Sequence, residues 1–297
     1  MKIFLLGVII CSSLFLNISY TQAQNYSNRQ EDVVPRKKWD LHLVWHDEFN
    51  KDGVPNPSNW NYEYGFVRNK ELQWYQPQNA ICQNGLLIIQ GKKEKVVNPH
   101  YSPGSSDWRN SREFASYTSS CVITKDLQEW KAGGYYEVRA RIDVKQGAWP
   151  AIWLLGTKDE WPANGEIDML EYYRIDNVPY ILANVAWGTS TRYKAAWDGA
   201  KKLYADFIRK DPDWDKKFHV WGMEWDEKYI RLYLDNELLN EIDLCKTLNA
   251  DGQNPFIGNR HFYFLLNLAL GANGGMPSDA DFPINFEVDY VRIYQEK

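Results

Sequence analysis

The sequence predicts an all-β fold, a sandwich of antiparallel sheets. Short runs of β-branched and aromatic residues dominate the chain, and turn-forming pairs such as Asn84-Gly85 and Gly133-Gly134 separate them. Helical periodicity is weak. The 297-residue chain contains neither an internal repeat nor a low-complexity linker. Because sandwiches of roughly 200–250 residues often form one domain, we expect a single folded domain.

The expected strands follow from local patterning. Residues 135–142 largely alternate apolar and charged side chains, as in a strand with one buried and one wet face. The best helical candidate is 195–208, and two long irregular stretches, 102–117 and 189–217, are candidates for binding loops. In chain order, the expected strands are 86–89, 135–142, 229–234, 261–268 and 286–294.

The N-terminus has the pattern of a secretory signal, in which Lys2 precedes an apolar run and small residues surround a cleavage site after Ala23. The apolar run, residues 3–16, has about 14 residues, fewer than the roughly 20 that a membrane-spanning helix needs. This favours export to the periplasm, the cell surface or the medium over a retained anchor. The expected organisation is a signal peptide at 1–23, a flexible segment at 24–38 and one folded domain at 39–297.

Charge and cysteine content argue against several classes of function. The formal net charge is −5, and the sequence contains no extended cluster of basic residues. Nucleic acid is therefore not an expected partner. Outside the signal, Cys82, Cys121 and Cys245 form an odd set that leaves at least one free thiol, and a Cys82–Cys121 disulfide stays open. Without Cys-x-x-Cys or paired histidines, zinc and redox chemistry are not indicated. We expect a monomer.

Three acidic residues, Glu166, Asp168 and Glu171, lie in an otherwise apolar, strand-like run. Burying carboxylates without partners is unfavourable, and like charges held close together raise a pKa. Two carboxyl groups of unequal pKa are what retaining glycoside hydrolysis requires, because one attacks the anomeric carbon while the other protonates the departing sugar. The alternative, a solvated acidic edge strand, leaves the apolar Ile167 and Met169 unexplained.

Strand geometry sets a condition on this interpretation. Side chains alternate between the two faces of a strand, so Glu166 and Asp168 share a face from which Glu171 would point away. One extra residue at Met169-Leu170, forming a β-bulge, brings Glu171 to the same face. We therefore predict a bulge at this position.

Further blocks extend the acidic run into a family pattern. In chain order they include Trp45-His46-Asp47-Glu48-Phe49, Asn69-Lys70-Glu71-Leu72-Gln73-Trp74-Tyr75, Gly147-Ala148-Trp149-Pro150-Ala151-Ile152-Trp153, Phe218-His219-Val220-Trp221-Gly222 and Val288-Asp289-Tyr290-Val291-Arg292. With these blocks the chain resembles glycoside hydrolase family 16, especially its laminarinase-like branch with a bulged Glu-x-Asp-x-x-Glu signature. The resemblance implies a β-jelly roll with a substrate cleft along its concave sheet, and a retaining, endo-acting enzyme that needs no cofactor.

The resemblance also implies roles for individual residues. Glu166 becomes the nucleophile and Glu171 the acid and base, with carboxyls about 5–5.5 Å apart, while Asp168 hydrogen-bonds Glu166. Asn69 and Glu71 resemble an element that holds sugar hydroxyls upstream of the cut, and tryptophan faces match sugar rings. The implied substrate-binding residues are Asn69, Glu71, Trp149, Trp153, Trp161, Trp187 and Asn267, with Arg68 and Trp74 as further candidates.

Two acidic residues resemble positions at which many relatives bind a structural calcium ion, on the convex face and far from the reaction. They are Glu48 and Asp289. Hard oxygen ligands suit calcium, although Asp289 could equally accept hydrogen bonds from backbone donors between strands. No catalytic role is expected for this ion.

One departure from the family pattern concerns the substrate. Laminarinase-like relatives commonly carry Val-His-Trp-Gly on the strand after the catalytic one, whereas this chain has Val185-Ala186-Trp187-Gly188. We expect β-1,3- or mixed β-1,3/1,4-glucan as the substrate. The missing imidazole keeps open β-galactan, or the galactose and N-acetylglucosamine chains of mucin O-glycans. An alternative of another class is a lectin-like protein that binds carbohydrate without cleaving it.

Overall fold

The computed structural model describes residues 41–296, so the expected signal peptide (1–23) and flexible segment (24–38) lie outside the described residues. The described chain consists mainly of strands in antiparallel sheets, which confirms the prediction of an all-β sandwich. None of the helices within 41–296 is long and apolar enough to cross a membrane.

One large sheet has eight strands, and its neighbouring strands are antiparallel. In spatial order they are β17 (Glu237–Asp243), β16 (Tyr229–Leu234), β15 (His219–Trp225), β10 (Gly134–Ile142), β19 (Ile284–Gln295), β5 (Leu86–Gly91) and β4 (Ala80–Gln83). The eighth strand, β1 (His42–Asp47), pairs with β19 beside this path.

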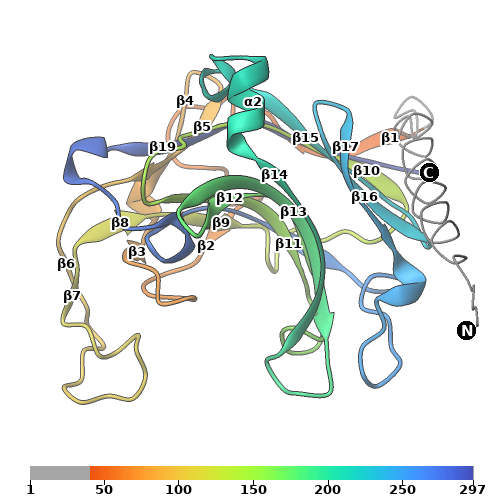
Figure 1. Cartoon of the computed structure of the whole chain (residues 1–297), viewed down its shortest axis with the longest axis horizontal. Helices are drawn as coiled ribbons and strands as arrows, with labels where there is room; N and C mark the ends of the chain where they lie inside the picture. Colours follow the sequence, from red (N-terminus) through yellow and green to blue (C-terminus); the bar gives the residue numbers. More distant parts are fainter. Residues whose placement is uncertain (1–40, 297) are drawn as a thin grey trace, which may run out of the picture. The chain divides into compact units, whose positions relative to one another are not determined.

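The other large sheet has seven strands and contains the acidic run. In spatial order they are β14 (Ala195–Leu203), β13 (Val178–Gly188), β12 (Glu166–Ile175), β11 (Ala148–Gly156), β18 (Phe262–Leu270), β9 (Cys121–Ile123) and β2 (Asn61–Tyr62). Figure 1 shows β12, β13 and β14 as strongly curved ribbons. This curvature gives the sheet a concave side.

Short elements complete the described chain. Two small sheets pair β3 (Gln73–Tyr75) with β8 (Tyr117–Ser119), in parallel, and β6 (Val96–Val97) with β7 (Phe114–Ala115). The helical elements are α2 (Tyr204–Lys210) and the 3-10 turns η2 (Pro77–Asn79), η3 (Trp214–Lys216), η4 (Leu244–Lys246), η5 (Ala272–Gly274) and η6 (Asp279–Asp281).

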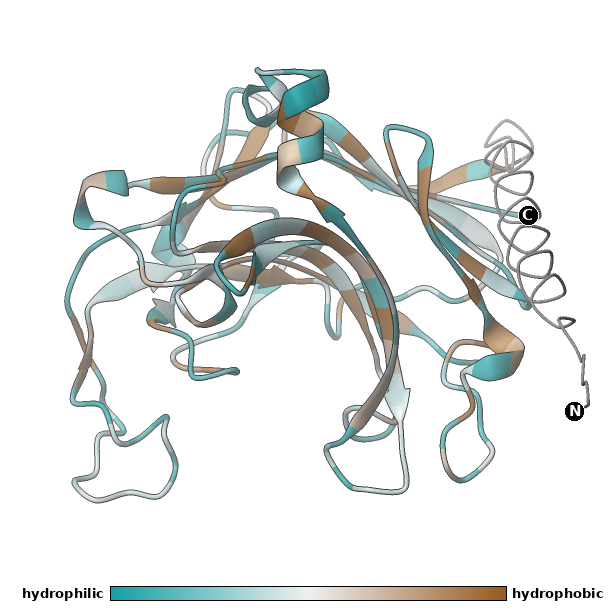
Figure 2. Cartoon of the chain, in the orientation of Figure 1, coloured by the Kyte–Doolittle hydropathy of each residue, from teal (hydrophilic) through white to brown (hydrophobic). Residues whose placement is uncertain are grey.

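The main core contains side chains from both large sheets, and strand alternation decides which side chains enter it. On β11, Ile152 and Leu154 are fully buried in this core. Their neighbour Trp153 points to the opposite face, where it packs in a smaller cluster with Tyr75 and Leu265. Figure 2 shows hydrophobic residues along the strands and hydrophilic residues on much of α2 and the loops. The second face of the seven-stranded sheet can therefore carry polar groups.

The five predicted strands are confirmed, but the predicted helix at 195–208 is wrong over most of its length. Residues 195–203 form β14, which pairs with β13 through nine residue pairs, and only Tyr204–Lys210 is helical. Gly199 lies in the middle of this segment, and glycine disfavours a helix interior by about 1 kcal/mol. Pairing with β13 outweighs the helical tendency of the alanine and lysine residues. The stretch 189–217 is therefore mostly regular.

The Cys82–Cys121 disulfide does not form. Cys82 lies on β4 of the eight-stranded sheet, whereas Cys121 lies on β9 of the seven-stranded sheet, and both are buried. Together with the exposed Cys245, all three cysteines within 41–296 are free thiols.

Candidate active site

Strand β12 contains the predicted bulge. On the β13 side, Asp168 pairs with Asn184, and the register then shifts by one residue before Glu171. The pairing of β12 with β11 shows the same one-residue excess at Met169. The prediction is confirmed: the extra residue changes the phase of the strand, so that Glu171 shares a face with Glu166 and Asp168.

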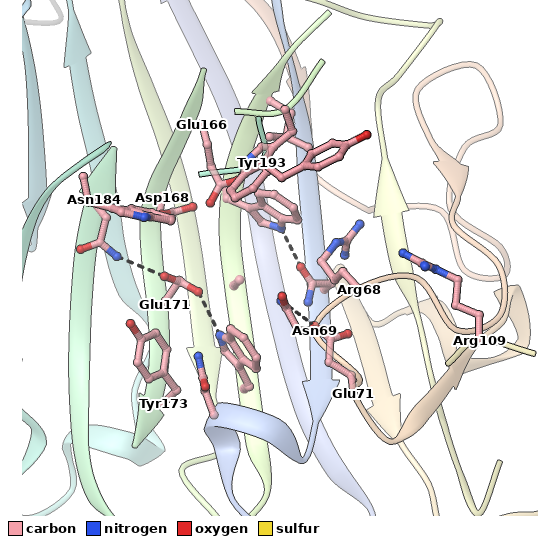
Figure 3. Close-up of a pocket in the computed structure, with 18 residues that line it drawn as sticks. Arg68, Asn69, Glu71, Arg109, Glu166, Asp168, Glu171, Tyr173, Asn184 and Tyr193 are labelled. Atoms are coloured by element: carbon pink, nitrogen blue, oxygen red, sulfur yellow. Dashed lines mark hydrogen bonds between the residues drawn. The ribbon is translucent and has the colours of Figure 1, made fainter. Parts of the chain in front are cut away.

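The three acidic side chains line one cavity of about 840 Å³ on the face of the seven-stranded sheet that is turned away from the main core. Figure 3 shows these three side chains along strand β12, opposite a loop that carries Arg68, Asn69 and Glu71. Six of the predicted substrate-binding residues line the same cavity, namely Asn69, Glu71, Trp149, Trp153, Trp161 and Asn267.

Each glutamate is held by a tryptophan. Trp161 Nε1 donates to Glu166 Oε2 at 2.8 Å, and Trp149 Nε1 donates to Glu171 Oε1 at 3.0 Å. The second oxygen of Glu171 accepts a hydrogen bond of 3.1 Å from Asn184 Nδ2 (Figure 3). These donors restrict the orientation of both carboxyl groups, as a reaction at a fixed point in the cavity requires.

Burial raises the pKa of all three acids. The pKa of Glu166 rises to about 7 because protein surrounds its carboxyl, although the Trp161 hydrogen bond and the Arg68 charge oppose this shift. Burial, together with the charge of Glu166, raises the pKa of Glu171 to about 8. Burial and the charges of both glutamates place the pKa of Asp168 well above its usual range. Of the two glutamates, Glu166 therefore ionises at lower pH than Glu171.

A polar group lies across the cavity from these acids (Figure 3). Glu71 is buried and accepts hydrogen bonds from Asn69 Nδ2 at 3.2 Å and from Gln73 Nε2 at 2.6 Å. Burial raises the pKa of Glu71. Asn69 and Lys70 both have φ of 54°, in the left-handed region that is uncommon for residues other than glycine. Such backbone strain is typical of binding sites, where the surrounding structure maintains it.

Asn267 on β18 positions Trp153. Trp153 Nε1 donates to Asn267 Oδ1 at 2.6 Å, and Asn267 Nδ2 donates to Tyr75 Oη at 3.0 Å. Arg68, which is paired with Glu63, lies over the indole with its Cζ 4.9 Å from the ring centroid. The edge of the Trp153 ring is thus fixed by a buried amide, and a cation lies over one face.

Comparison with known proteins identifies the family. The family model "Glycosyl hydrolases family 16" matches residues 75–260. The chain belongs to this family. A beta-glucanase of Rhodothermus marinus is 30% identical over 309 residues, which cover 98% of this chain and 93% of the relative. The chain is thus a glycoside hydrolase with the predicted jelly-roll fold.

Two solved structures extend the comparison. One is described by the words "Prominent members of the human gut microbiota express endo-acting O-glycanases to initiate mucin breakdown". It has 34% identity and a TM-score of 0.76, covering 87% of this chain and 92% of the other. The laminarinase catalytic domain from Thermotoga maritima has 30% identity and a TM-score of 0.70, covering 87% and 99%.

Trp187 does not lie where the sequence predicts in this family 16 enzyme. Alternate residues of β13 face the same side, and Asn184 lines the cavity, so Ala186 shares its face and Trp187 points the other way. Trp187 packs against the main core instead. Trp74 also lies outside the cavity lining and packs edge-on against Phe66, with ring centroids 5.4 Å apart.

The sequence patterns did not single out several residues that line the cavity. They include Arg109, Tyr173, Asn184, Tyr193 and Trp197. Of these, Arg109 lies in the stretch 102–117, and Tyr193 and Trp197 lie in 189–217, the two stretches predicted as candidate binding loops. Asn184 has a recognisable signal once β12 and β13 are paired, because it lies directly opposite Asp168. Its other neighbour is Gly199, where a Cβ atom would lie 2.4 Å from Asn184 Oδ1. A glycine there makes room for the amide that holds Glu171.

The predicted calcium ligands have arginine partners. Arg292 donates to both oxygens of Glu48 at 2.8 Å, and Asp289 is paired with Arg139. Within residues 41–296, no group of three or more His, Cys, Asp or Glu side chains is arranged to hold a metal ion. This arrangement does not fit the predicted calcium site, because guanidinium groups occupy the carboxylate oxygens that calcium would need.

We expect Trp149→Phe and Trp161→Phe to shift opposite limbs of the pH–activity profile of this family 16 enzyme. Activity that needs Glu166 ionised and Glu171 protonated rises through a pKa of about 7 and falls through a pKa of about 8. Each indole donor favours the charged carboxylate, so its removal raises the pKa of its partner. Trp149→Phe should move the alkaline limb of kcat/KM to higher pH, and Trp161→Phe should move the acid limb to higher pH. Identical profiles for the two variants would contradict this assignment.

Proposed function

We propose that this enzyme hydrolyses internal bonds of a β-glycan with retention of configuration, and that β-1,3- or mixed β-1,3/1,4-glucan is the substrate. The bulge in β12 carries this proposal, because it turns three acids into one cavity and leaves two glutamates with unequal, raised pKa values. A retaining glycosidase needs two such carboxyl groups, one as nucleophile and one as acid and base.

In the proposed mechanism Glu166 is the nucleophile. It has the lower pKa of the two glutamates, about 7 against about 8 for Glu171, so it is the first to ionise as pH rises. Its carboxylate attacks the anomeric carbon and forms a covalent glycosyl-enzyme while the leaving oxygen departs. The mechanism uses no cofactor.

Glu171 transfers the proton in both steps. It protonates the leaving oxygen as the first bond breaks, and it then removes a proton from the water that releases the sugar from Glu166. Burial and the charges of both glutamates raise the pKa of Asp168, which favours its protonated form. In the proposed mechanism, the protonated Asp168 turns its Oδ2, which has no hydrogen-bond partner in the structure, to Glu166 and donates to it, and this favours the ionised nucleophile.

The opposite side of the cavity holds the sugars upstream of the cut in this proposal. The amide of Asn69 and the buried carboxyl of Glu71 offer donors and acceptors to sugar hydroxyls. A substrate that lacks a matching hydroxyl leaves such groups unpaired, which disfavours its binding. Trp153, which Asn267 holds and Arg68 covers on one face, lies beside them in the cavity lining.

A second candidate substrate is the galactose and N-acetylglucosamine chain of O-glycans. The solved structure whose description names endo-acting O-glycanases and mucin breakdown shares 34% identity with this chain. Ala186, at the position of the histidine of laminarinase-like enzymes, lies directly opposite Glu166 on the cavity face. Loss of an imidazole there changes the contacts beside the cleaved bond, and this leaves room for a sugar other than glucose.

The test is a panel of laminarin, lichenan, agarose, porphyran and mucin O-glycans, with separation of the products. Release of oligosaccharides from laminarin or lichenan is expected, and release from mucin O-glycans alone would select the second candidate. A protein that binds one of these glycans and never releases reducing ends would be the lectin-like alternative, and the proposed hydrolysis would then be wrong.

We also propose that the protein is exported as a monomer after cleavage behind Ala23. The support is the N-terminal pattern of Lys2 followed by the apolar run 3–16. Expression in a bacterial host and intact-mass measurement of the exported protein should give a chain that begins at Gln24. Recovery of a chain with an intact N-terminus in the membrane fraction would contradict this proposal.

A further inference from the structure

We propose that Trp197, supported by Tyr193, forms a binding platform for the sugars downstream of the cleaved bond, the part of the glycan that departs. This inference rests on the proposed function, in which Asn69 and Glu71 hold the sugars upstream. It assigns to this chain a second aromatic subsite, on the opposite side of the acids.

The strand register places Trp197 in line with the proposed nucleophile. Glu166 on β12 pairs with Ala186 on β13, and Ala186 pairs with Trp197 on β14. Directly paired residues project from the same face of a sheet, and both Glu166 and Trp197 line the cavity. Two strand spacings separate them, roughly 10 Å. Asn267, on β18, lies equally far from β12 in strand order on the other side.

Trp197 is available to a ligand, unlike the tryptophans nearer the acids. It is 52% exposed, whereas Trp149 and Trp153 are each 7% exposed. The indole N–H groups of Trp149, Trp153 and Trp161 are committed to Glu171, Asn267 and Glu166. Among the described residues, Trp197 has no side-chain hydrogen bond and no ring contact. A large aromatic side chain that is exposed beside a catalytic cavity is suited to stack against a sugar ring.

The loop that carries Tyr193 is tied to the segment beside the nucleophile. Glu160 accepts hydrogen bonds from Tyr193 Oη at 2.5 Å and from Arg192 Nε at 3.0 Å. Trp161, which donates to Glu166, is the next residue after Glu160. Tyr193 has a φ of 61°, an uncommon conformation for an aromatic residue. The surrounding contacts thus hold Tyr193 at the cavity wall, next to Trp197 on the same hairpin.

Neighbouring side chains leave room for a sugar at this place. Ala186, between Glu166 and Trp197, has only a methyl group. Beside them, Asn184 faces Gly199, which has no side chain at all. A pyranose ring can therefore approach the Trp197 indole without displacing a large residue, and its C–H face would contact the aromatic face.

The test compares a substrate that has sugars downstream of the cut with one that has none there. In 4-nitrophenyl β-laminaritrioside an aryl group replaces the downstream sugars, whereas laminarin provides them. For Trp197→Ala we expect the ratio of kcat/KM on laminarin to kcat/KM on the aryl glycoside to fall about tenfold. Transfer of the glycosyl group to added laminaribiose should fall with it. Trp197→Phe keeps an aromatic face and should lose less.

Leu203→Ala is the matched control, because Leu203 is an exposed apolar residue of the same strand that does not line the cavity. Its ratio should stay within twofold of the wild type. A Trp197→Ala variant with an unchanged ratio, or with equal losses on both substrates, would overturn the proposed subsite. Wild-type activity on the aryl glycoside tests the proposed function separately. Should the panel select O-glycans, poly-N-acetyllactosamine and its 4-nitrophenyl trisaccharide replace the glucan pair.

Discussion

Replacing Glu166 by glutamine is expected to lower kcat by about 10⁴-fold or more, because the amide cannot form the covalent glycosyl-enzyme. The change removes a charge and almost no volume, so the fold and glycan binding should be retained. Trp161 Nε1 has an oxygen acceptor in either side chain. The measurements are kcat on the cleaved glycan, the melting temperature, and oligosaccharide binding by calorimetry.

Glu237→Gln is a suitable control for this experiment. Glu237 is an exposed residue of β17 in the eight-stranded sheet, outside the cavity lining. The control should keep wild-type kcat and melting temperature. A Glu166→Gln variant that retains more than a few per cent of wild-type activity would remove Glu166 from the role of nucleophile.

Replacing Glu171 by alanine is expected to produce a different kind of defect. On a natural glycan, general acid catalysis is lost and kcat/KM should fall by about 10²- to 10⁴-fold. An aryl glycoside with a good leaving group needs no acid in the first step, so the covalent intermediate should still form and then accumulate. Added azide can attack this intermediate without a general base, and turnover should recover.

The configuration of the azide product separates the two glutamates. With Glu171→Ala, azide displaces Glu166 from the covalent intermediate, and two inversions leave a β-glycosyl azide. With Glu166→Ala, azide enters the space of the missing nucleophile and attacks an activated β-glycoside once, which gives an α-glycosyl azide. An α product from the Glu171→Ala variant would exchange the two assignments.

The arrangement of donors explains how one strand can hold three neighbouring acids. Isolated buried carboxylates are unstable, and here the raised pKa values mean that the site avoids full ionisation near neutral pH. Trp161 donates to Glu166 and Trp149 donates to Glu171, whereas Asn184 donates to Glu171 and also interacts with Asp168, whose Oδ2 has no hydrogen-bond partner. The site thus differentiates the three carboxyls by their surroundings.

Much of the fold and the catalytic strand could be predicted from local sequence. The strands 86–89 and 229–234 have turn residues at their ends and few competing helical signals. The bulge at Met169-Leu170 was predictable because side chains alternate strictly along a strand, so three acids that share one face require one extra residue.

Side chains on neighbouring strands were harder to predict, because their faces depend on register. Trp187 lies in a family-like block, yet the pairing of β13 with β12 turns it toward the main core, against which it packs partly buried, and turns Asn184 to the cavity. The segment 195–208 has the composition of a short helix, yet residues 195–203 form β14 because they pair with the neighbouring strand β13. Neither outcome follows from the composition of the segment alone.

The sequence by itself determined the sheet-forming segments, the three acids and the bulge that brings them to one face, because these depend on residues close together in the chain. Only the tertiary structure decided which side chains meet those acids from other strands. Asn184 reaches Glu171 and Trp197 joins the cavity wall because hydrogen-bonded register sets the face and the depth of every residue on β13 and β14. That register is a property of paired strands, and no single segment of sequence contains it.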